Sequence, residues 1–303
     1  PPFFIFPRFR AGFFMAQPLK ISLLFTRFYA LQGTLHNFPK TDFPKSPREN
    51  NRVFLRFVIS YNNAMAWYQD RIFRRIFTAL ALVKTLAFIY LCFFHPLGEA
   101  VLVFPDSLSY IYPAQTLLQH GALWEAVSAN PLLFRTPGYP LFLALIQLVF
   151  NNLTWAVAGV QNVLSLFLLV PVYLTARQLA GQTAARWAAA LCALSGLYFS
   201  LSFAVLTEVL CTFLLSWFVY ITIRLMQTPR PPLLLGSALL LAAAVYVRPA
   251  AYYFSFAAAL MLVCFSAGRL IRCSIRNGLV FFLLPLTLGL GGWQVRNYVQ
   301  TGF

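Results

Sequence analysis

The chain has 303 residues, of which 60% are hydrophobic and only 10% are charged. Soluble domains carry about 25% charged residues, so this composition excludes a soluble protein and indicates one that lies in a lipid bilayer. The net charge of +16 does not indicate nucleic-acid binding, because the basic residues are dispersed among apolar stretches and form no stripe with stacking aromatics. A basic excess in a membrane protein is typical of cytoplasmic loops.

The first 64 residues differ from the rest of the chain, being rich in Phe, Arg and Pro without a persistent hydrophobic period. They contain no clean signal peptide, because the apolar run Ile21–Phe25 is short and Arg27 follows it. We therefore interpret residues 1–64 as a poorly structured or non-native extension, with Met65 as the expected natural start. Residues 65–303 are expected to form a transmembrane module that is truncated at its C-terminus.

Seven apolar segments are long enough to cross a bilayer as helices, which takes about 20 residues each. The fold class is therefore all-α, a polytopic transmembrane bundle of about seven spans. An eighth apolar stretch, residues 139–150, is too short for a comfortable crossing. The seven segments cover about residues 76–94, 156–175, 184–204, 207–226, 232–247, 250–268 and 278–295.

The arginines of the short loops predict the orientation, because cytoplasmic loops are enriched in Lys and Arg. They share one side only if residues 139–150 do not cross. We therefore expect that stretch to be a juxtamembrane or re-entrant helix in the first outside loop, with the N-terminus cytoplasmic. The arginines concerned are Arg71, Arg74, Arg75, Arg177, Arg186, Arg224, Arg230, Arg269, Arg272 and Arg276.

The apolar segments contain few residues that could carry charge or bind a metal. Lys84 lies inside the first span, where a lysine costs about 2–3 kcal/mol unless it snorkels or pairs, and it is expected to reach the bundle interior. The five cysteines have no Cys-x-x-Cys spacing and are interpreted as small buried apolar residues, not as disulfides or metal ligands. They are Cys92, Cys192, Cys211, Cys264 and Cys273.

The long outside loop, about residues 96–138, carries the first group of polar residues that could support chemistry. In its sequence PDSLSY (residues 105–110), Asp106 and Tyr110 are four residues apart and share a helix face. Asp106 either caps the helix that follows or acts as a general base that activates an acceptor hydroxyl. The sequence RTPGYP (residues 135–140) then forms a tight turn into a helix. A cation at a helix N-terminus is unfavourable, so Arg135 is expected to have an anionic partner.

Three further charged residues lie at span ends on the outside. Glu208 opens a span, where the helix dipole alone accounts for a carboxylate, or it contacts substrate, a metal or an arginine. Arg248 ends a span, as a cation commonly does, but it does so on the side that is poor in cations. Arg296 follows the interface anchor Trp293 and is either a snorkelling flank or part of a site.

Together these residues place one candidate base, a second carboxylate and three arginines on one bilayer face. A leaving phosphate needs cations and an acceptor hydroxyl needs a base. The chain has no GxxxxGK[ST] loop, no GxGxxG and no Asp-x-Asp. Neither an ATP-driven nor a nucleotide-sugar mechanism is therefore indicated.

The ordered set of motifs resembles the GT-C superfamily of polyprenyl-phosphate-sugar glycosyltransferases. The nearest branch contains the bacterial relatives of dolichyl-phosphate-mannose protein mannosyltransferases (glycosyltransferase family 39) and of the aminoarabinose transferase that acts on lipid A. The resemblance runs from about residue 71 to the end. It rests on Asp106 with Tyr110 and Ala114, the turn 135–140, Thr207-Glu208, Arg248-Pro249, and Trp293 with Arg296-Asn297.

The resemblance implies a glycosyltransferase that inverts the anomeric carbon with Asp106 as catalytic base. It implies that Tyr110, Arg135, Tyr139, Glu208, Arg248 and Arg296 bind substrate. The donor would be a polyprenyl-phosphate-linked sugar, and the acceptor a hydroxyl of protein, lipid A or polysaccharide. Some relatives bind a divalent metal near the site, but His95 and His120 are isolated here. The implied location is the bacterial inner membrane, with the site on the outer, periplasmic face.

Two other functions are open. A transporter or flippase for a lipid-linked glycan would need charges in mid-membrane and gating glycines in paired helices. A non-catalytic membrane fragment would have no need of Asp106.

Overall fold

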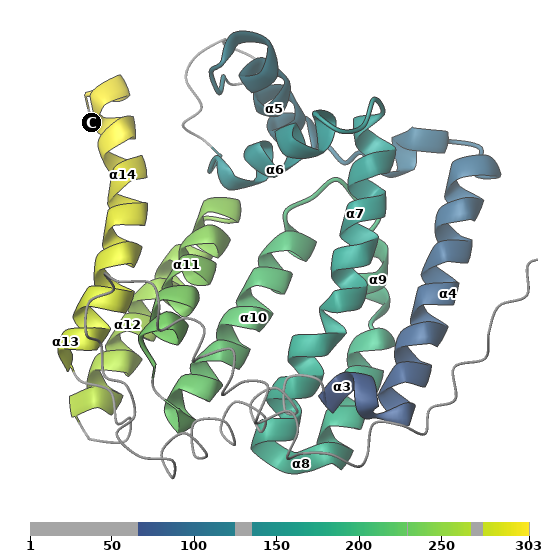
Figure 1. The fold of residues 1–303 in the computed structure, drawn as a ribbon. Coiled ribbons are helices and arrows are strands. Elements are labelled where there is room, and N and C mark those ends of the chain that lie inside the picture. The colour runs from purple at the N-terminus through teal and green to yellow at the C-terminus, as the bar shows by residue number, and fades with distance from the viewer. Residues whose placement is uncertain (1–65, 125–134, 229, 268–274, 303) are drawn as a thin grey trace, which may run out of the picture. The chain divides into compact units, whose positions relative to one another are not determined.

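In the described part of the chain, the secondary structure elements are all helices, joined by turns and loops. The structure is a computed structural model that describes residues 66–124, 135–228, 230–267 and 275–302, all of them in one compact unit, residues 61–303. The all-α prediction is confirmed for these residues (Figure 1). The helices are α3 Ala66–Gln69, α4 Arg71–Phe93, η1 Gly98–Val101, α5 Leu108–His120, α6 Gly138–Gln147, α7 Leu153–Phe167, α8 Leu169–Ala193, α9 Gly196–Leu201, α10 Glu208–Gln227, α11 Pro231–Val247, α12 Ala251–Ala267, α13 Ile275–Gly278, η2 Leu279–Leu283 and α14 Leu284–Thr301.

Several parts of the sequence interpretation lie outside the described residues. These are the extension 1–64 with Met65, and also Arg269, Arg272 and Cys273.

Four helical stretches are long and apolar enough to cross a membrane: Arg71–Phe93, Leu153–Ala193, Glu208–Gln227 and Arg276–Gln300. The predicted number of about seven is therefore not confirmed. The shortfall arises partly from length, because α11 and α12 have 17 residues each and span about 25 Å at 1.5 Å per residue. The helix α6 has 10 residues, about half the length that a crossing needs.

The helix α8, within the apolar stretch Leu153–Ala193, contains a kink at Gly181 where two helices meet. Gly181 has φ 82° and ψ −175°, which is not a helical conformation. This backbone region favours glycine because a side chain would clash with the chain. The part of α8 before Gly181 continues α7, and the part after it leads towards α9.

Asp70 fastens the start of α4 to both sides of this turn. Its carboxylate caps α4 by accepting hydrogen bonds from the amides of Ile72 and Phe73. It also accepts hydrogen bonds from the Tyr173 hydroxyl (2.8 Å), Gln182 Nε2 (2.9 Å) and Arg186 Nε (2.9 Å). Burial alone would raise the pKa of this carboxyl, but these donors outweigh burial and hold the pKa well below its usual range.

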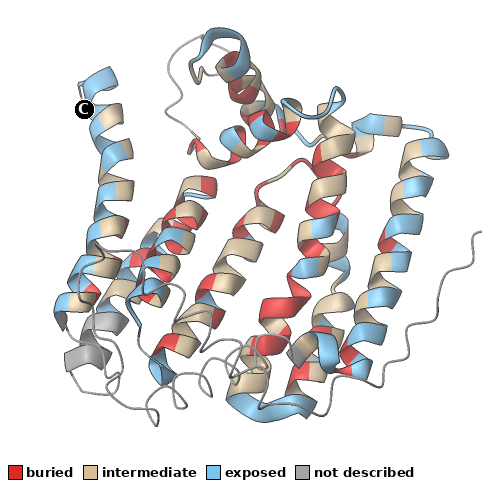
Figure 2. Ribbon diagram, viewed as in Figure 1, coloured by how far each residue is buried: buried red, intermediate tan, exposed pale blue. Residues whose placement is uncertain are grey.

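Buried residues concentrate on the middle helices. Figure 2 shows them along α7, α10 and α11 and on α5 and α6, whereas α4 and α14 are mainly exposed or half-exposed. On α4 the exposed residues include Leu82, Val83 and Leu86, and an apolar exposed helix surface is what contact with lipid requires. One apolar cluster joins α5 and α6 to the ends of α10 and α11 that face them, and it supports the candidate site.

Candidate active site

Asp106 lies on a loop that is fastened to the segment before α10. The Ser107 hydroxyl accepts a hydrogen bond from the Phe104 amide (2.9 Å) and donates one to the Val205 carbonyl (2.8 Å). The Val205 amide donates in turn to the Leu102 carbonyl (2.9 Å). The N-cap of α5 is Ser107, without a side-chain capping bond, so the interpretation of Asp106 as a cap is wrong. The carboxylate has a different partner and is 68% exposed.

That partner is Arg135, from the turn that enters α6. Arg135 Nη2 lies 2.9 Å from Asp106 Oδ1, and its Nε donates to the Ser109 hydroxyl at 3.1 Å. The guanidinium carbon also lies 4.7 Å from the centre of the Tyr110 ring, where a cation is attracted by the π-system. The anionic partner expected for Arg135 is therefore Asp106, which is 29 residues away in the chain.

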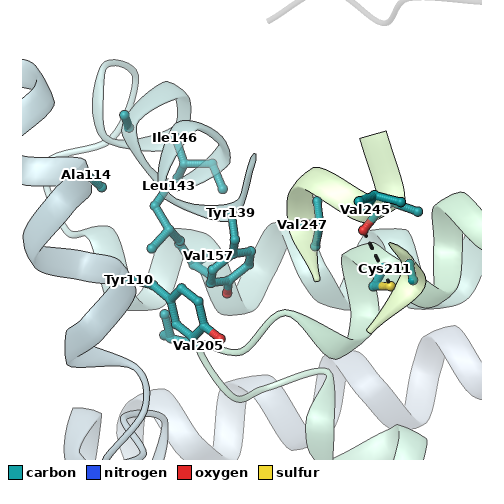
Figure 3. Packing of buried hydrophobic residues seen from close by; sticks show 13 residues of the cluster. Tyr110, Ala114, Tyr139, Leu143, Ile146, Val157, Val205, Cys211, Val245 and Val247 are labelled. Atoms are coloured by element: carbon teal, nitrogen blue, oxygen red, sulfur yellow. Dashed lines mark hydrogen bonds between the residues drawn. The ribbon is translucent and has the colours of Figure 1, made fainter. Parts of the chain in front are cut away.

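Two tyrosines pack against the Arg135 side of this ion pair, Tyr110 directly and Tyr139 through Tyr110. The rings of Tyr110 and Tyr139 meet edge to face at 5.1 Å, and Figure 3 shows their hydroxyl oxygens pointing to the same side. Tyr139 is fully buried, and its hydroxyl accepts a hydrogen bond from Gln161 Nε2 (2.9 Å). Burial raises the pKa of Tyr139 well above its usual value, and it raises that of Tyr110 against the opposing charge of Arg135. Both hydroxyls therefore stay protonated and act as hydrogen-bonding groups.

A second ion pair joins the facing ends of α10 and α11. Glu208 is the first residue of α10 and Arg248 is the C-cap of α11. Arg248 Nη1 lies 2.7 Å from Glu208 Oε1, and both side chains are partly exposed. Glu208 thus contacts an arginine, as one alternative expected, and it also lies in the first turn of α10, where the helix dipole accounts for a carboxylate. The Glu208 charge also acts on the hydroxyls of Tyr110 and Tyr139, which links the two ion pairs.

A close backbone approach holds α6 against α11 and brings the two arginines onto neighbouring elements. A Cβ atom at Gly138 would lie 2.6 Å from the carbonyl carbon and oxygen of Tyr246, and 2.9 Å from the amide nitrogen of Val247. Only glycine permits this contact. Six of the seven predicted site residues thus belong to one group, which we call the two-pair site: Asp106, Tyr110, Arg135, Tyr139, Glu208 and Arg248.

Arg296, the seventh, lies in a neighbouring group on α14. Its guanidinium carbon is 4.6 Å from the centre of the Trp293 ring, and its Nη1 donates to Asn297 Oδ1 (2.9 Å). Trp293 meets the ring of Tyr246 at 6.4 Å. Tyr246 is the residue against which Gly138 packs, so α11 lies between Arg296 and α6.

Lys84 reaches the bundle interior, as predicted. It is 2% exposed, and its ammonium donates to Ser202 Oγ (2.5 Å) and Asn162 Oδ1 (3.2 Å). The rings of Phe199 and Phe203 lie 4.6 and 5.4 Å away. The charge is thus stabilised by neutral dipoles and π-faces.

Gln161 and Ser109 were not among the residues singled out from the sequence, although both contact the site. A signal for Gln161 existed, since it lies in an apolar segment next to Asn162. Polar residues inside such segments face the bundle interior and find partners there. Ser109, in the first turn of α5, has no such signal.

Metal ligation has little support in the described residues. Their His, Cys, Asp and Glu side chains form no group of three or more that could hold a metal ion. The two carboxylates of the site are each paired with an arginine. These residues do not form a metal-ligand set, and we derive no step through a metal.

Apolar helices with an ionic site at one end define an integral membrane protein. The sequence profile of the dolichyl-phosphate-mannose-protein mannosyltransferase family matches residues 134–293, slightly more than half of the chain, and the chain belongs to this family. It is accordingly a membrane glycosyltransferase of the GT-C type. No curated protein and no solved structure matches the chain.

Proposed function

We propose that this glycosyltransferase moves a sugar from a polyprenyl-phosphate donor to a hydroxyl acceptor on the outer face of the membrane, with Asp106 as the base. The observation that carries the proposal is the two-pair site, in which two carboxylates and two arginines lie on adjoining elements at one end of the bundle. A phosphate that leaves with a developing charge needs cations, and an acceptor hydroxyl needs a base.

The proposed chemistry is a direct, inverting displacement. The acceptor oxygen forms a bond to the anomeric carbon, and the bond from that carbon to the phosphate oxygen breaks. The acceptor proton passes to the Asp106 carboxylate, while the electron pair leaves with the phosphate towards Arg135 or Arg248. The exposure of Asp106, 68%, leaves room for an acceptor.

In the absence of donor, Arg135 occupies the Asp106 carboxylate at 2.9 Å. A donor phosphate would compete for the guanidinium and release the carboxylate for its role as base. Ser109 and the Tyr110 ring hold Arg135 independently of Asp106, so the arginine would keep its place during this exchange. Tyr139 supports the ring of Tyr110 from below. We assign Arg296 to the outer part of a donor or acceptor path.

The proposed topology has about seven crossings with the site outside. Gly181 divides Leu153–Ala193 into two legs, and α11 and α12 would count as short crossings. Support for the orientation comes from the arginines at the other end of the bundle. Asp70 binds Arg186 beside the start of α4, and Arg230 precedes α11 at the end opposite Arg248. Cytoplasmic ends are enriched in such residues, which favours the periplasmic face of a bacterial inner membrane for the site.

The test compares wild type with Asp106→Asn in liposomes that contain a panel of labelled polyprenyl-phosphate sugars and membrane extract as acceptor. The readout is the release of free polyprenyl phosphate. We expect a loss of about 10²–10⁴-fold with little change in stability, because an exposed ion pair contributes at most about 1 kcal/mol.

The matched control is Glu99→Gln, which changes a carboxylate that binds Asn152 away from the two-pair site. It should retain release. Equal release by Asp106→Asn and wild type would refute the base assignment. No release from any donor by a folded wild type would favour the transporter, flippase or non-catalytic alternatives.

A further inference from the structure

The chain between α9 and α10 carries Glu208 into the site but is not helical. Ser202 and Val205 in this segment, residues 202–207, are fully buried, and Thr207 is 3% exposed. Backbone groups that leave a helix inside an apolar bundle lose their intrahelical partners, and each unpaired group is costly. The position of Glu208 therefore depends on the groups that pair with this segment.

Two consecutive amides of α7 hold the segment at its two ends. Asn162 Oδ1 accepts from the Ser202 hydroxyl (3.1 Å), and its Nδ2 donates to the Ser202 carbonyl (3.3 Å). Gln161 Nε2 donates to the Leu206 carbonyl (2.7 Å), two residues before Glu208. Since the Leu206 carbonyl can only accept, the amide nitrogen of Gln161 must be the atom that faces it.

Gln161 also reaches α6. The same Nε2 donates to the Tyr139 hydroxyl (2.9 Å), and the Gln161 side chain is fully buried. Both hydrogens of the amide nitrogen are thus used, one on the segment that leads to Glu208 and one on the tyrosine that supports the Tyr110–Arg135 stack. Because the Tyr139 hydroxyl accepts this bond, its own proton takes no part in it.

We infer that Gln161 is a positioning residue of the active site. It acts through Leu206 on Glu208 and through Tyr139 on Arg135, and so sets the spacing between the two ion pairs without touching donor or acceptor. A misplacement of about 1 Å far from the reacting atoms can cost about 10²-fold in rate. This inference rests on the proposed function.

The principal test is Gln161→Leu, which makes the side chain apolar at a similar size and removes both hydrogen bonds that Nε2 donates. The matched control is Ser165→Ala, one turn further along α7. Its hydroxyl is equally buried but donates only to the Asn162 carbonyl of its own helix (2.7 Å). Per folded protein, we expect Gln161→Leu to slow the release of polyprenyl phosphate by about 10-fold or more. Ser165→Ala should stay within about 2-fold of wild type, as expected for a residue outside the network.

A double-mutant comparison with Glu208 distinguishes a positioning role of Gln161 from a general loss of folded structure. If Gln161 acts through both Glu208 and Tyr139, adding Gln161→Leu to Glu208→Gln should slow release by less than Gln161→Leu does alone, because only the route through Tyr139 then remains. A general loss of structure would multiply the two effects. Gln161→Glu is the second variant, in case Gln161→Leu does not fold. Its ionised carboxylate cannot donate to Leu206 whereas the protonated form can, so its activity relative to wild type should rise as the pH falls.

Each outcome has one meaning. Equal release by Gln161→Leu and Ser165→Ala, multiplying effects, or a wild-type pH profile for Gln161→Glu would overturn the inference and leave the proposed function standing. A folded wild type that releases no polyprenyl phosphate would overturn both. Slow release that couples to Glu208 would establish the positioning role.

Discussion

Replacing Gly138 with alanine adds one methyl group at the closest approach between α6 and α11. The new Cβ would lie 2.6 Å from the carbonyl atoms of Tyr246 and 2.9 Å from the amide of Val247. Carbon atoms in proteins attract best at about 3.5–4.0 Å, so the helices must separate by several tenths of an ångström or more. Backbone atoms cannot rotate away as a side chain would. Overpacking of this kind costs about 1–3 kcal/mol.

The same displacement should reach the chemistry. Arg135 precedes Gly138 by three residues, and Arg248 follows Val247 directly, so separating these backbones moves the two arginines apart. We expect Gly138→Ala to slow the release of polyprenyl phosphate from liposomes by about 10–100-fold. Its free energy of unfolding, measured by chemical denaturation in the same lipid, should fall by about 1–3 kcal/mol.

Gly159→Ala is the matched control, because it makes the same chemical change on α7. There the new Cβ would only touch Phe88 Cζ at 3.8 Å, an ordinary contact. Alanine is also favoured over glycine inside a helix by about 0.5–1 kcal/mol, so this variant should be as active as wild type and no less stable. If Gly138→Ala matches Gly159→Ala in both measurements, the α6–α11 contact does not position the site.

Two further predictions concern the ion pairs. Glu208→Gln breaks the 2.7 Å pair with Arg248. Because the pair is partly exposed, the free energy of unfolding should change by less than about 1 kcal/mol, while the release of polyprenyl phosphate should fall about 10-fold or more. Release at the wild-type rate would exclude a role for this carboxylate. Asp70→Asn leaves Arg186 without its buried partner and should lower the free energy of unfolding, measured with denaturant, by about 2–3 kcal/mol. This is less than for a fully buried pair because the Arg186 side chain is one-third exposed. The pKa of Asp70 is lowered from its ordinary 3.8, so its contribution is complete above about pH 4 and is lost as the pH falls further. Asp70→Asn should lack that part of the acid-induced loss of stability. An identical pH dependence of stability in wild type and variant would contradict the role given to the Asp70 carboxylate.

The helices were predictable because apolar length is a local property, but the breaks between them were not. The apolar segment 184–204 was predicted as one span, whereas the structure has a helix that ends at Ala193, the short α9, and the non-helical residues 202–207. No proline interrupts this stretch of the sequence. The break is stabilised by partners that come from elsewhere in the chain, such as Asn162 and Gln161 on α7.

The candidate site was predictable as a set of residues but not as a set of contacts. The scarcity of charge in this chain made Asp106, Arg135, Glu208 and Arg248 conspicuous, and their positions at helix ends followed from the apolar segments. The role of Gln161 was hidden, because a single amide in an apolar helix indicates some buried partner without saying which one.

Composition and hydropathy alone therefore determine that the chain is helical, lies in a membrane and carries its few charged groups at helix ends, because these properties depend on residue type and local length. Only the tertiary structure decides that Arg135 pairs with Asp106 and Arg248 with Glu208, across 29 and 40 residues of chain. The physical reason is packing. The missing side chain of Gly138 lets α6 reach the backbone of α11, and one buried amide on α7 holds both α6 and the segment before α10.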